Sequence, residues 1–378
     1  MKPLLSFLLT IALSNLVIGQ TTAVPDINFE QALINLGYDF GTPDGSVITA
    51  NIDTVATLNI MNNNISDLTG IEDFTALNHL NCYGNLLTSI NVTQNNALNI
   101  LQCTYNQLTS LNVTQNVDLT ELSCAANQLT SLDVTQNSDL TFLSCANNSL
   151  TSLDVTQNNL IDTLFCELNQ LTSLNVTQNT DLILLSCFTN VLSSLDVSQN
   201  ILLTKLYCEE NALTELDVSQ SVELIRLNCS NNPLTCLNVK NGNNINFLPN
   251  GLSFSNNPGL TCIEVDDPIW SAANWNNVDS PSLFSLNCVP CALGINENNL
   301  SNFICYPNPT TGNITINLGE VKTSVKVKLT NSLGQVFLHK QFGATNHFNI
   351  DVDVPTGVYI LLVETGKGES IAIKVIKK

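Results

Sequence analysis

Apolar positions recur every 21 residues from about residue 80 to residue 230, in the frame L-x-x-L-x-C-x-x-N-x-L-T-S-L-[DN]-V-[TS]-Q-N. In the run L-x-C, side chains alternate between the faces of an extended chain, so Leu143 and Cys145 point inward. The alternate residues Phe142, Ser144 and Ala146 then point outward. Such a long repeat predicts near-identical coils stacked into a solenoid, with strands about 4.8 Å apart in a parallel sheet.

One cysteine occupies the same inward position in eight consecutive coils: Cys82, Cys103, Cys124, Cys145, Cys166, Cys187, Cys208 and Cys229. Neighbouring Cα atoms would lie about 5 Å apart, inside the range for a disulfide. Their Cα–Cβ bonds run parallel in a stacked sheet, however, which is poor geometry for a bridge. We therefore expect buried, unreactive thiols that act as small apolar side chains. Partial disulfides and a metal site are the alternatives.

An asparagine follows each strand, at Asn85, Asn106, Asn127, Asn148, Asn169, Asn190, Asn211 and Asn232. Its amide can bond backbone groups that a turn leaves unpaired, so we expect a column of amides where the chain leaves the sheet. Leu150, Leu153 and Val155 supply further inward side chains. Because no stretch of the repeat has about 10–12 residues of helical period, we expect strands on both sides of each coil.

The two ends of the repeat carry cap signals. Residues 24–36 predict an amphipathic helix, capped by Asp26 and ended by Gly37. After the repeat, Cys262 and Cys288 bracket a segment with two tryptophans, which suggests a closing cap held by a disulfide. Cys236, Cys291 and Cys305 have no assigned partner. The C-x-x-C match at Cys288 and Cys291 lacks the βαβ context of a redox site.

The spacing L-x-x-L-x-C-x-x-N is that of a leucine-rich repeat, with cysteine where the usual pattern carries leucine. Residues 55–265 resemble the 21-residue leucine-rich repeats common in Bacteroidetes surface proteins. The preceding stretch resembles the N-terminal cap of that group, in the motif Phe29-Glu30-Gln31-Ala32-Leu33 and in the run from Ile65 to Phe74. The resemblance implies a mainly β, leucine-rich-repeat solenoid with parallel strands and little helix.

The C-terminal segment alternates apolar and polar residues in three runs, starting at Ile314, Val325 and Tyr359. With turns at Gly334 and Gly357, this pattern predicts a small immunoglobulin-like β-sandwich. Residues 306–378 also resemble the type A C-terminal sorting domain of the type IX secretion system. The resemblance rests on Tyr306, Pro307, Asn308, Pro309, Gly312, Gly334, Gln335, Pro355, Gly357, Tyr359, Lys374, Lys377 and Lys378. It implies export by the type IX machinery, then removal of this domain and either surface attachment or release.

Residues 1–20 read as a secretory signal peptide, with Lys2 before a mostly apolar run. No segment has about 18 unbroken apolar residues, so we expect no transmembrane helix. The expected organisation is a signal peptide (1–20), an N-terminal cap (21–54), the solenoid (55–265), a C-terminal cap and linker (266–305) and the sorting domain (306–378).

Charge is distributed unevenly along the chain. Residues 3–305 carry 3 basic and 27 acidic side chains, a net charge of −24, whereas residues 306–378 carry 8 lysines and 5 acidic side chains, a net charge of +3. Such an acidic field repels nucleic acid, so we expect no nucleic-acid partner. Its simplest interpretation is a solvated surface; the alternative is attraction of a divalent cation or a cationic partner.

An enzymatic role has little support. The three histidines are His79, His339 and His347, and no nucleophile is evidently placed beside them. The sequence has no glycine-rich phosphate loop, no paired histidines and no zinc spacing. We therefore expect neither catalysis nor a cofactor.

The outward positions of the cysteine-bearing strands vary between coils, whereas the rest of each coil changes little. A varied face on a constant framework is how repeat proteins present a binding surface. The expected contact residues are Phe142, Phe165, Glu167, Leu184, Phe188, Lys205, Tyr207, Glu209 and Arg226. We expect a secreted or cell-surface binding protein that recognises an extracellular protein or glycan. The alternatives are drift among duplicated repeats and a structural spacer without a ligand.

A second column on the closing side of the coils contains both aspartate and asparagine. Asp133 and Asp154 are neighbours in this column, as are Asp196 and Asp217. Calcium could relieve their repulsion, but a single column of oxygen atoms is thin for an ion that takes about six to eight ligands. We expect at most a weak calcium site.

Overall fold

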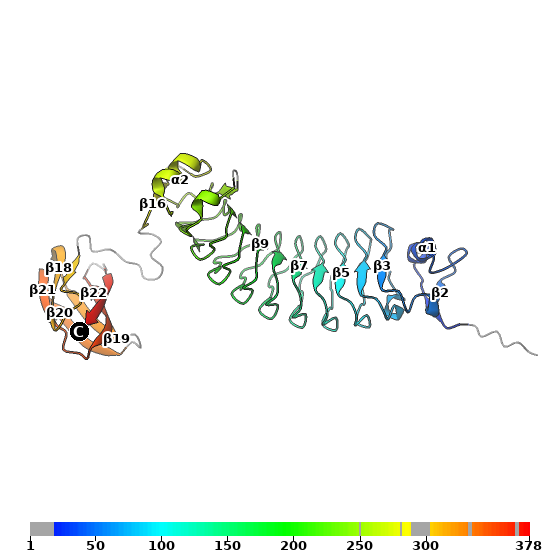
Figure 1. Cartoon of the computed structure of the whole chain (residues 1–378), viewed down its shortest axis with the longest axis horizontal. Coiled ribbons are helices and arrows are strands. Elements are labelled where there is room, and N and C mark those ends of the chain that lie inside the picture. Colours follow the sequence, from blue (N-terminus) through cyan, green and yellow to red (C-terminus); the bar gives the residue numbers. More distant parts are fainter. Residues whose placement is uncertain (1–18, 249–250, 280–281, 289–302, 332–334, 367–369) are drawn as a thin grey trace, which may run out of the picture. The chain divides into compact units, whose positions relative to one another are not determined.

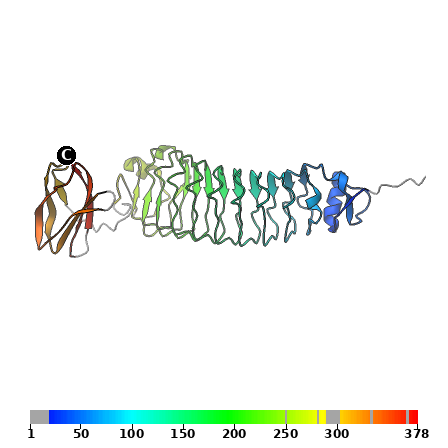
Figure 2. The same cartoon turned by 90° about the horizontal axis from the view of Figure 1, so that it is seen from below.

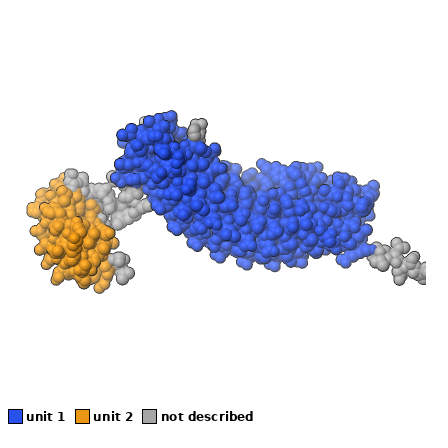
Figure 3. Space-filling model, in the orientation of Figure 1, with its two compact units in different colours: residues 1–291 blue, residues 292–378 orange. Residues whose placement is uncertain are grey.

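The computed structural model describes residues 19–248, 251–279, 282–288, 303–331, 335–366 and 370–378. The chain forms two compact units, residues 1–291 and residues 292–378 (Figure 3). Residues 1–18 of the predicted signal peptide lie outside the described residues.

A small cap covers the first coil of the solenoid. The predicted helix is confirmed as α1 (Ile27–Leu36), which starts after Asp26 because the Asp26 carboxylate accepts hydrogen bonds from the N–H groups of Asn28 (2.9 Å) and Phe29 (3.0 Å). β1 (Thr21–Ala23) pairs antiparallel with β2 (Ser46–Ile48). Phe29 is fully buried and stacks on Phe74 with ring centroids 6.4 Å apart, so the cap joins the core.

The hydrophobic repeat forms a stack of coils with a ten-stranded parallel sheet along one side (Figures 1 and 2). The sheet order is β14-β12-β10-β9-β8-β7-β6-β5-β4-β3. Its strands are β3 (Thr57–Asn59), β4 (His79–Asn81), β5 (Ile100–Gln102), β6 (Glu121–Ser123), β7 (Phe142–Ser144), β8 (Thr163–Phe165), β9 (Leu184–Ser186), β10 (Lys205–Tyr207), β12 (Arg226–Asn228) and β14 (Leu252–Ser253). The predicted solenoid of parallel strands is confirmed.

The cysteine column lies in the core. All eight cysteines are buried free thiols, as predicted. Burial raises the pKa of Cys103 and of Cys145 to about 12, so these thiols stay protonated. They fill the positions that a leucine would otherwise occupy.

The turn asparagines (Asn85 to Asn232 in the column given above) hold a strained turn. Leu168, the residue before one of them, has a left-handed backbone with φ 55°, which residues other than glycine rarely adopt. The next residue, Asn169, accepts the N–H of Leu150 on Oδ1 (2.9 Å). Its Nδ2 donates to the carbonyl oxygens of Cys145 (3.1 Å) and Cys166 (3.2 Å). One amide thus ties two coils together at the turn.

A second set of buried asparagines, the loop asparagines, follows the closing side at Asn95, Asn116, Asn137, Asn158, Asn179 and Asn200. Each donates through Nδ2 to two carbonyl oxygens of the preceding coil. Asn158, for example, donates to Val134 (2.8 Å) and Asn137 (2.7 Å). These bonds link successive coils in the turn that leads from the closing side to the next strand.

The prediction of strands on both sides of every coil is wrong for most of the stack. In the described residues, the closing side pairs only at the C-terminal end, in the sheet β11-β13-β15-β16. Its strands are β11 (Glu215–Asp217), β13 (Cys236–Asn238), β15 (Cys262–Glu264) and β16 (Leu283–Ser285). Leu150 and Val155 do point inward and are fully buried. The apolar pattern therefore identified burial, but burial does not require a regular strand.

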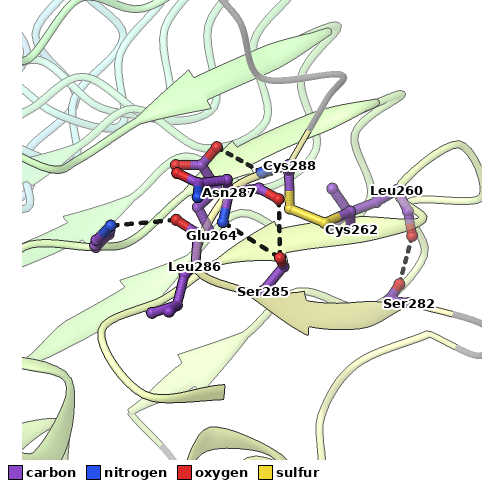
Figure 4. The surroundings of a disulfide bond; sticks show 9 residues. Leu260, Cys262, Glu264, Ser282, Ser285, Leu286, Asn287 and Cys288 are labelled. Atoms are coloured by element: carbon purple, nitrogen blue, oxygen red, sulfur yellow. Dashed lines mark hydrogen bonds between the residues drawn. A yellow bond between two sulfur atoms is a disulfide. The ribbon is translucent and has the colours of Figure 1, made fainter. Parts of the chain in front are cut away.

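The predicted disulfide between Cys262 and Cys288 is confirmed, with Cα atoms 5.7 Å apart (Figure 4). The N–H of Cys288 donates to Oε1 of Glu264 (2.8 Å), beside the bridge. Cys236 is also disulfide-bonded, Cys305 is free, and Cys291 lies outside the described residues. The cap includes α2 (Pro268–Asn274). Elsewhere in the described part of the chain, short 3-10 helices occur at Thr49–Asn51, Ile71–Asp73 and Asn244–Asn246.

The second unit is a β-sandwich, as predicted. Its sheets are β17-β18-β21 and β20-β19-β22-β23. The strands are β17 (Ile304–Tyr306), β18 (Asn313–Lys322), β19 (Val325–Asn331), β20 (Val336–Phe342), β21 (Thr345–Asp351), β22 (Gly357–Glu364) and β23 (Ser370–Lys377). The alternating residues Ile316, Val327 and Leu361 are fully buried between them. Gly357 begins β22 rather than lying in the turn before it.

Candidate binding face

The strand face comprises the three outward positions of each coil along β4 to β10 and β12. Pairing between strands keeps equivalent positions in line, so that Phe142 pairs with Thr163, and Leu184 with Lys205. The alternate residues, such as Leu143, are fully buried in the core. The strand face therefore consists of three parallel columns of side chains.

The predicted contact residues all lie in these columns. The first column holds Phe142, Leu184, Lys205 and Arg226, the second holds Phe165 and Tyr207, and the third holds Glu167, Phe188 and Glu209. Eight of the nine are half-buried, and Arg226 is exposed. The fold thus brings residues from five coils onto one surface that solvent reaches.

Aromatic side chains form the raised parts of this surface. Phe142 and Phe165 contact each other across two strands, with ring centroids 5.8 Å apart. Ser186 lies between Phe165 and Tyr207 in the second column and is only 2% exposed. Sequence alternation placed Ser186 and Ala146 outward, yet both are buried, because larger neighbours cover small side chains on the strand face.

Two carboxylates in the third column lack a full set of partners. One oxygen of Glu167 and one of Glu209 are buried and accept no hydrogen bond from the described residues. Burial raises the pKa of both carboxyls, and repulsion from Glu210 and Glu167 adds to the rise at Glu209. The one ion pair in the described part of the chain joins Lys322 and Glu320, so neither carboxylate has a cation beside it.

Residues at the other end of the strand face were not among the expected contact residues. Tyr83 and Tyr105 contact each other edge to face, with centroids 5.4 Å apart. Met61, Asn81, Tyr83, Gln102, Thr104 and Ser123 line a hollow of about 260 Å³ beside them. Most of these residues lie at the outward strand positions that the sequence identified as variable. Their small polar side chains gave no sign in the sequence that the surface is hollowed there.

The aspartate column of the closing side has a local explanation. Asp133 accepts the N–H (3.0 Å) and the hydroxyl (2.7 Å) of Thr135 on Oδ1, and Asp154 accepts those of Thr156 at 2.9 and 2.7 Å. Asp196 and Asp217 accept the N–H of the second residue after them, and so do the asparagines Asn91, Asn112, Asn175 and Asn238 of the same column.

These turns need one acceptor oxygen, which explains why Asp and Asn interchange. The hydroxyl of Thr135 lowers the pKa of Asp133. Among the described residues, no three His, Cys, Asp or Glu side chains come together in a way that could hold a metal ion. Weak calcium binding stays a prediction.

The sorting-motif residues lie in the second unit, where its first and last segments meet. Asn308 Nδ2 donates to the carbonyl of Lys374 (2.6 Å), and the N–H of Ile376 donates to Asn308 Oδ1 (2.9 Å). Lys377 Nζ donates to the carbonyl of Thr311 (2.7 Å). The motif therefore fastens the start of the sandwich to its last strand.

Other motif residues form turns of the same unit. The Tyr359 hydroxyl donates to the carbonyl of Pro355 (2.9 Å), and the N–H of Gln335 donates to Asn331 Oδ1 (2.9 Å). The N–H of Gly312 donates to Thr310 Oγ1 (3.0 Å). Tyr306, Pro307, Pro309 and Lys378 are exposed, whereas Gly334 lies outside the described residues.

Comparison with known proteins identifies both units. Residues 304–378 match the family described as a secretion system C-terminal sorting domain. The functional domain of InlJ from Listeria monocytogenes, described as including a cysteine ladder, matches with 25% identity and a TM-score of 0.50, over 95% of this chain and 99% of that one.

An internalin, InlF, from Listeria monocytogenes shares the fold at 16% identity and a TM-score of 0.50, over 71% of this chain and 92% of that one. No curated protein sequence matches the chain significantly. In the residues that the structure describes, no helix is both long and apolar enough to cross a membrane.

The cysteine-bearing coils and these structural matches make the first unit a leucine-rich-repeat solenoid. The family match makes residues 304–378 a type IX secretion system sorting domain, so the chain is one that is exported to the cell surface or the extracellular space.

Proposed function

We propose that this chain is a secreted or cell-surface binding protein without enzymatic activity, which recognises a protein or glycan through the strand face. The observation that carries the proposal is the pair of incompletely bonded carboxylates, Glu167 and Glu209, on either side of Phe188. Burying part of a charge without a partner lowers stability. A ligand that supplies hydrogen-bond donors would remove this deficit.

The charge of the solenoid indicates what such a ligand carries. Residues 3–305 have a net charge of −24, which attracts cationic groups and steers them to the surface. A lysine or arginine of a partner protein can pair with Glu167 or Glu209 while its aliphatic stem covers Phe188. The aromatic residues Phe142 and Phe165 beside them supply the apolar contact that anchors protein interfaces. A protein partner with a basic patch fits these features best.

The chemistry of the cysteines supports a role without catalysis. The thiolate is the nucleophilic form of cysteine. Burial raises the pKa of every thiol in the cysteine column, at Cys82, Cys103, Cys124, Cys145, Cys166, Cys187, Cys208 and Cys229. These side chains are also closed to solvent, so none of them can attack a substrate.

A binding screen tests the proposed function. The purified protein is screened against extracellular-matrix proteins and a glycan panel, with and without calcium, beside the double variant Phe165→Ser with Phe188→Ser. The matched control is Ile201→Ser with Val222→Ser, which removes two exposed apolar side chains from neighbouring coils outside the strand face.

We expect saturable binding that the face variant loses and the control keeps. Replacing central aromatic residues of an interface typically costs about 2 kcal/mol or more, roughly thirtyfold in affinity. No binding by the folded protein would favour a spacer in which the face has drifted freely. Equal binding by both variants would place the contact away from Phe165 and Phe188.

A further inference from the structure

A hollow in the first part of the strand face lies apart from the proposed protein contact. It spans four successive coils, those of β3, β4, β5 and β6, and encloses about 260 Å³. Its lining residues are Met61, Asn81, Tyr83, Gln102, Thr104 and Ser123. It shares no residue with the aromatic group around Phe165. Asn81, Gln102 and Ser123 pair side by side in the sheet, so the floor of the hollow is rigid.

The sequence produces this depression by a change in side-chain size. In the third column, Tyr83 is followed by Thr104 and then by Ala125 in the next two coils. Tyr83 therefore stands as a wall, and the surface beyond it drops to small side chains. Tyr105 packs edge to face on Tyr83 and helps to hold its ring in place.

The polar groups of the hollow have unused bonding capacity. Gln102 Nε2 donates to Glu121 Oε1 (2.7 Å), which fixes the amide. Its own Oε1 accepts no hydrogen bond from the residues that the structure describes. Within the described residues, the hydroxyls of Tyr83, Thr104 and Ser123 take part in no side-chain hydrogen bond, although each can donate one bond and accept others. One rigid aromatic wall thus faces several oriented polar groups across a small space.

We propose that this hollow binds one unit of a neutral carbohydrate. A sugar ring combines an apolar face of C–H groups, which stacks on an aromatic ring, with hydroxyls that exchange hydrogen bonds with amides and hydroxyls. A volume of about 260 Å³ lies just below the range of roughly 300–1,000 Å³ for ligand pockets, which suits a single ring rather than a larger molecule. The net charge of −24 on residues 3–305 disfavours acidic sugars.

Titration of the purified protein with neutral oligosaccharides tests this site. The probes are oligosaccharides of glucose, mannose, galactose and N-acetylglucosamine. Their binding is measured by calorimetry or by competition on a glycan array. Ser123→Leu fills the hollow, and Gln102→Leu removes its amide. Ser144→Leu is the matched control, because Ser144 holds the same strand position in the next coil but does not line the hollow.

We expect saturable binding of at least one probe, weakened at least tenfold by Ser123→Leu and by Gln102→Leu and changed less than twofold by Ser144→Leu. No binding of any neutral probe by the folded protein would overturn the proposal. Equal binding by Ser123→Leu and Ser144→Leu would overturn it as well. So would sugar binding that is lost only in the variant Phe165→Ser with Phe188→Ser.

The outcome is independent of the proposed protein contact. The variant Phe165→Ser with Phe188→Ser should leave the sugar titration unchanged, since neither residue lines the hollow. Loss of protein binding with sugar binding intact would place two recognition sites on one face. Sugar binding without any protein partner would leave this inference standing while the proposed protein contact around Phe165 failed.

Discussion

The strand face and the closing side of the coils are both open to solvent, yet they follow opposite rules. On the closing side the same residues recur, because exposed side chains there build the backbone turn. Thr135 and Thr156 each donate a hydroxyl to the aspartate two residues earlier, at 2.7 Å. On the strand face, pairing between strands fixes the backbone, so outward residues are not needed for folding. Repetition therefore marks folding, and variation marks freedom to recognise.

The strongest way to break this comparison is to remove a repeated side chain that ties coils together. Asn169→Ala leaves the buried N–H of Leu150 without its acceptor and removes two donors to carbonyl oxygens. An unpaired buried donor costs about 1–3 kcal/mol, and each lost hydrogen bond about 1 kcal/mol. We expect the free energy of unfolding to fall by about 3–4 kcal/mol in urea denaturation.

The neighbouring Gln170→Ala is the control, because Gln170 is exposed. It should change stability by no more than about 0.5 kcal/mol. Asn158→Ala, which removes one of the loop asparagines, should lower the free energy of unfolding by about 2–3 kcal/mol, a loss between those of the other two variants. The loss is smaller than for Asn169→Ala because the Val134 carbonyl still accepts the N–H of Asn137 (3.0 Å). Equal losses for Asn158→Ala and Gln170→Ala would contradict a structural role for the loop asparagines.

The sequence predicted what depends on side-chain burial and missed what depends on backbone geometry. The inward positions of Leu143 and Cys145, the cap at Asp26 and the Cys262–Cys288 bridge followed from pattern and spacing. The left-handed backbone before each turn asparagine could not be predicted from the sequence, because that position is a leucine in one coil, a threonine in the next and a glutamate in a third. The turn asparagine imposes the conformation on any residue there.

The same division holds for the candidate site. Period and alternation placed Phe165 and Glu167 on one face, and they are there. Which small residues are covered, as at Ser186, depends on the volumes of neighbours from other coils. So does the hollow beside Tyr83, which exists because three coils differ in size at one position. Such relief appears only when the coils are stacked.

A second prediction concerns the cysteine column. Cys145 is fully buried, so Cys145→Ser places an unpaired hydroxyl in an apolar core, at a cost of about 2 kcal/mol. Cys166 Sγ lies 3.5 Å from the carbonyl oxygen of Ser186, so a serine there retains an acceptor within reach. We expect Cys166→Ser to lose less stability in urea denaturation. Equal losses would show that both positions respond to packing alone.

A third prediction restores a missing member of the loop asparagines. In the coil after Asn200, this position holds Ser221, which is fully buried and whose hydroxyl has no partner among the described residues. Ser221→Asn should donate to Val197 and Asn200, as Asn200 does to Val176 (3.0 Å) and Asn179 (2.8 Å).

We expect Ser221→Asn to gain about 1 kcal/mol of stability in urea denaturation, whereas Ser193→Asn, at an exposed site, should gain nothing measurable. A loss at Ser221→Asn would mean that this coil has closed around the smaller side chain.

The smallest expected effect tests whether the strand face gives up stability for recognition. Burial raises the pKa of Glu167 and of Glu209, so the folded chain holds these protons at a pH where the unfolded chain has released them. Ionised, the two carboxyls lower stability at neutral pH. The penalty fades as pH falls through their raised pKa toward the usual glutamate value. Glu167→Gln with Glu209→Gln should raise Tm by about 1–2 °C at pH 7 and by less near pH 4, whereas the exposed Glu215→Gln should not raise it.

A double variant that is no more stable than the unchanged protein at pH 7 would show that the two carboxyls do not lower stability. If it is more stable but no longer binds the partner, selection has kept a cost that folding alone would have eliminated, and the variation of the strand face is not drift.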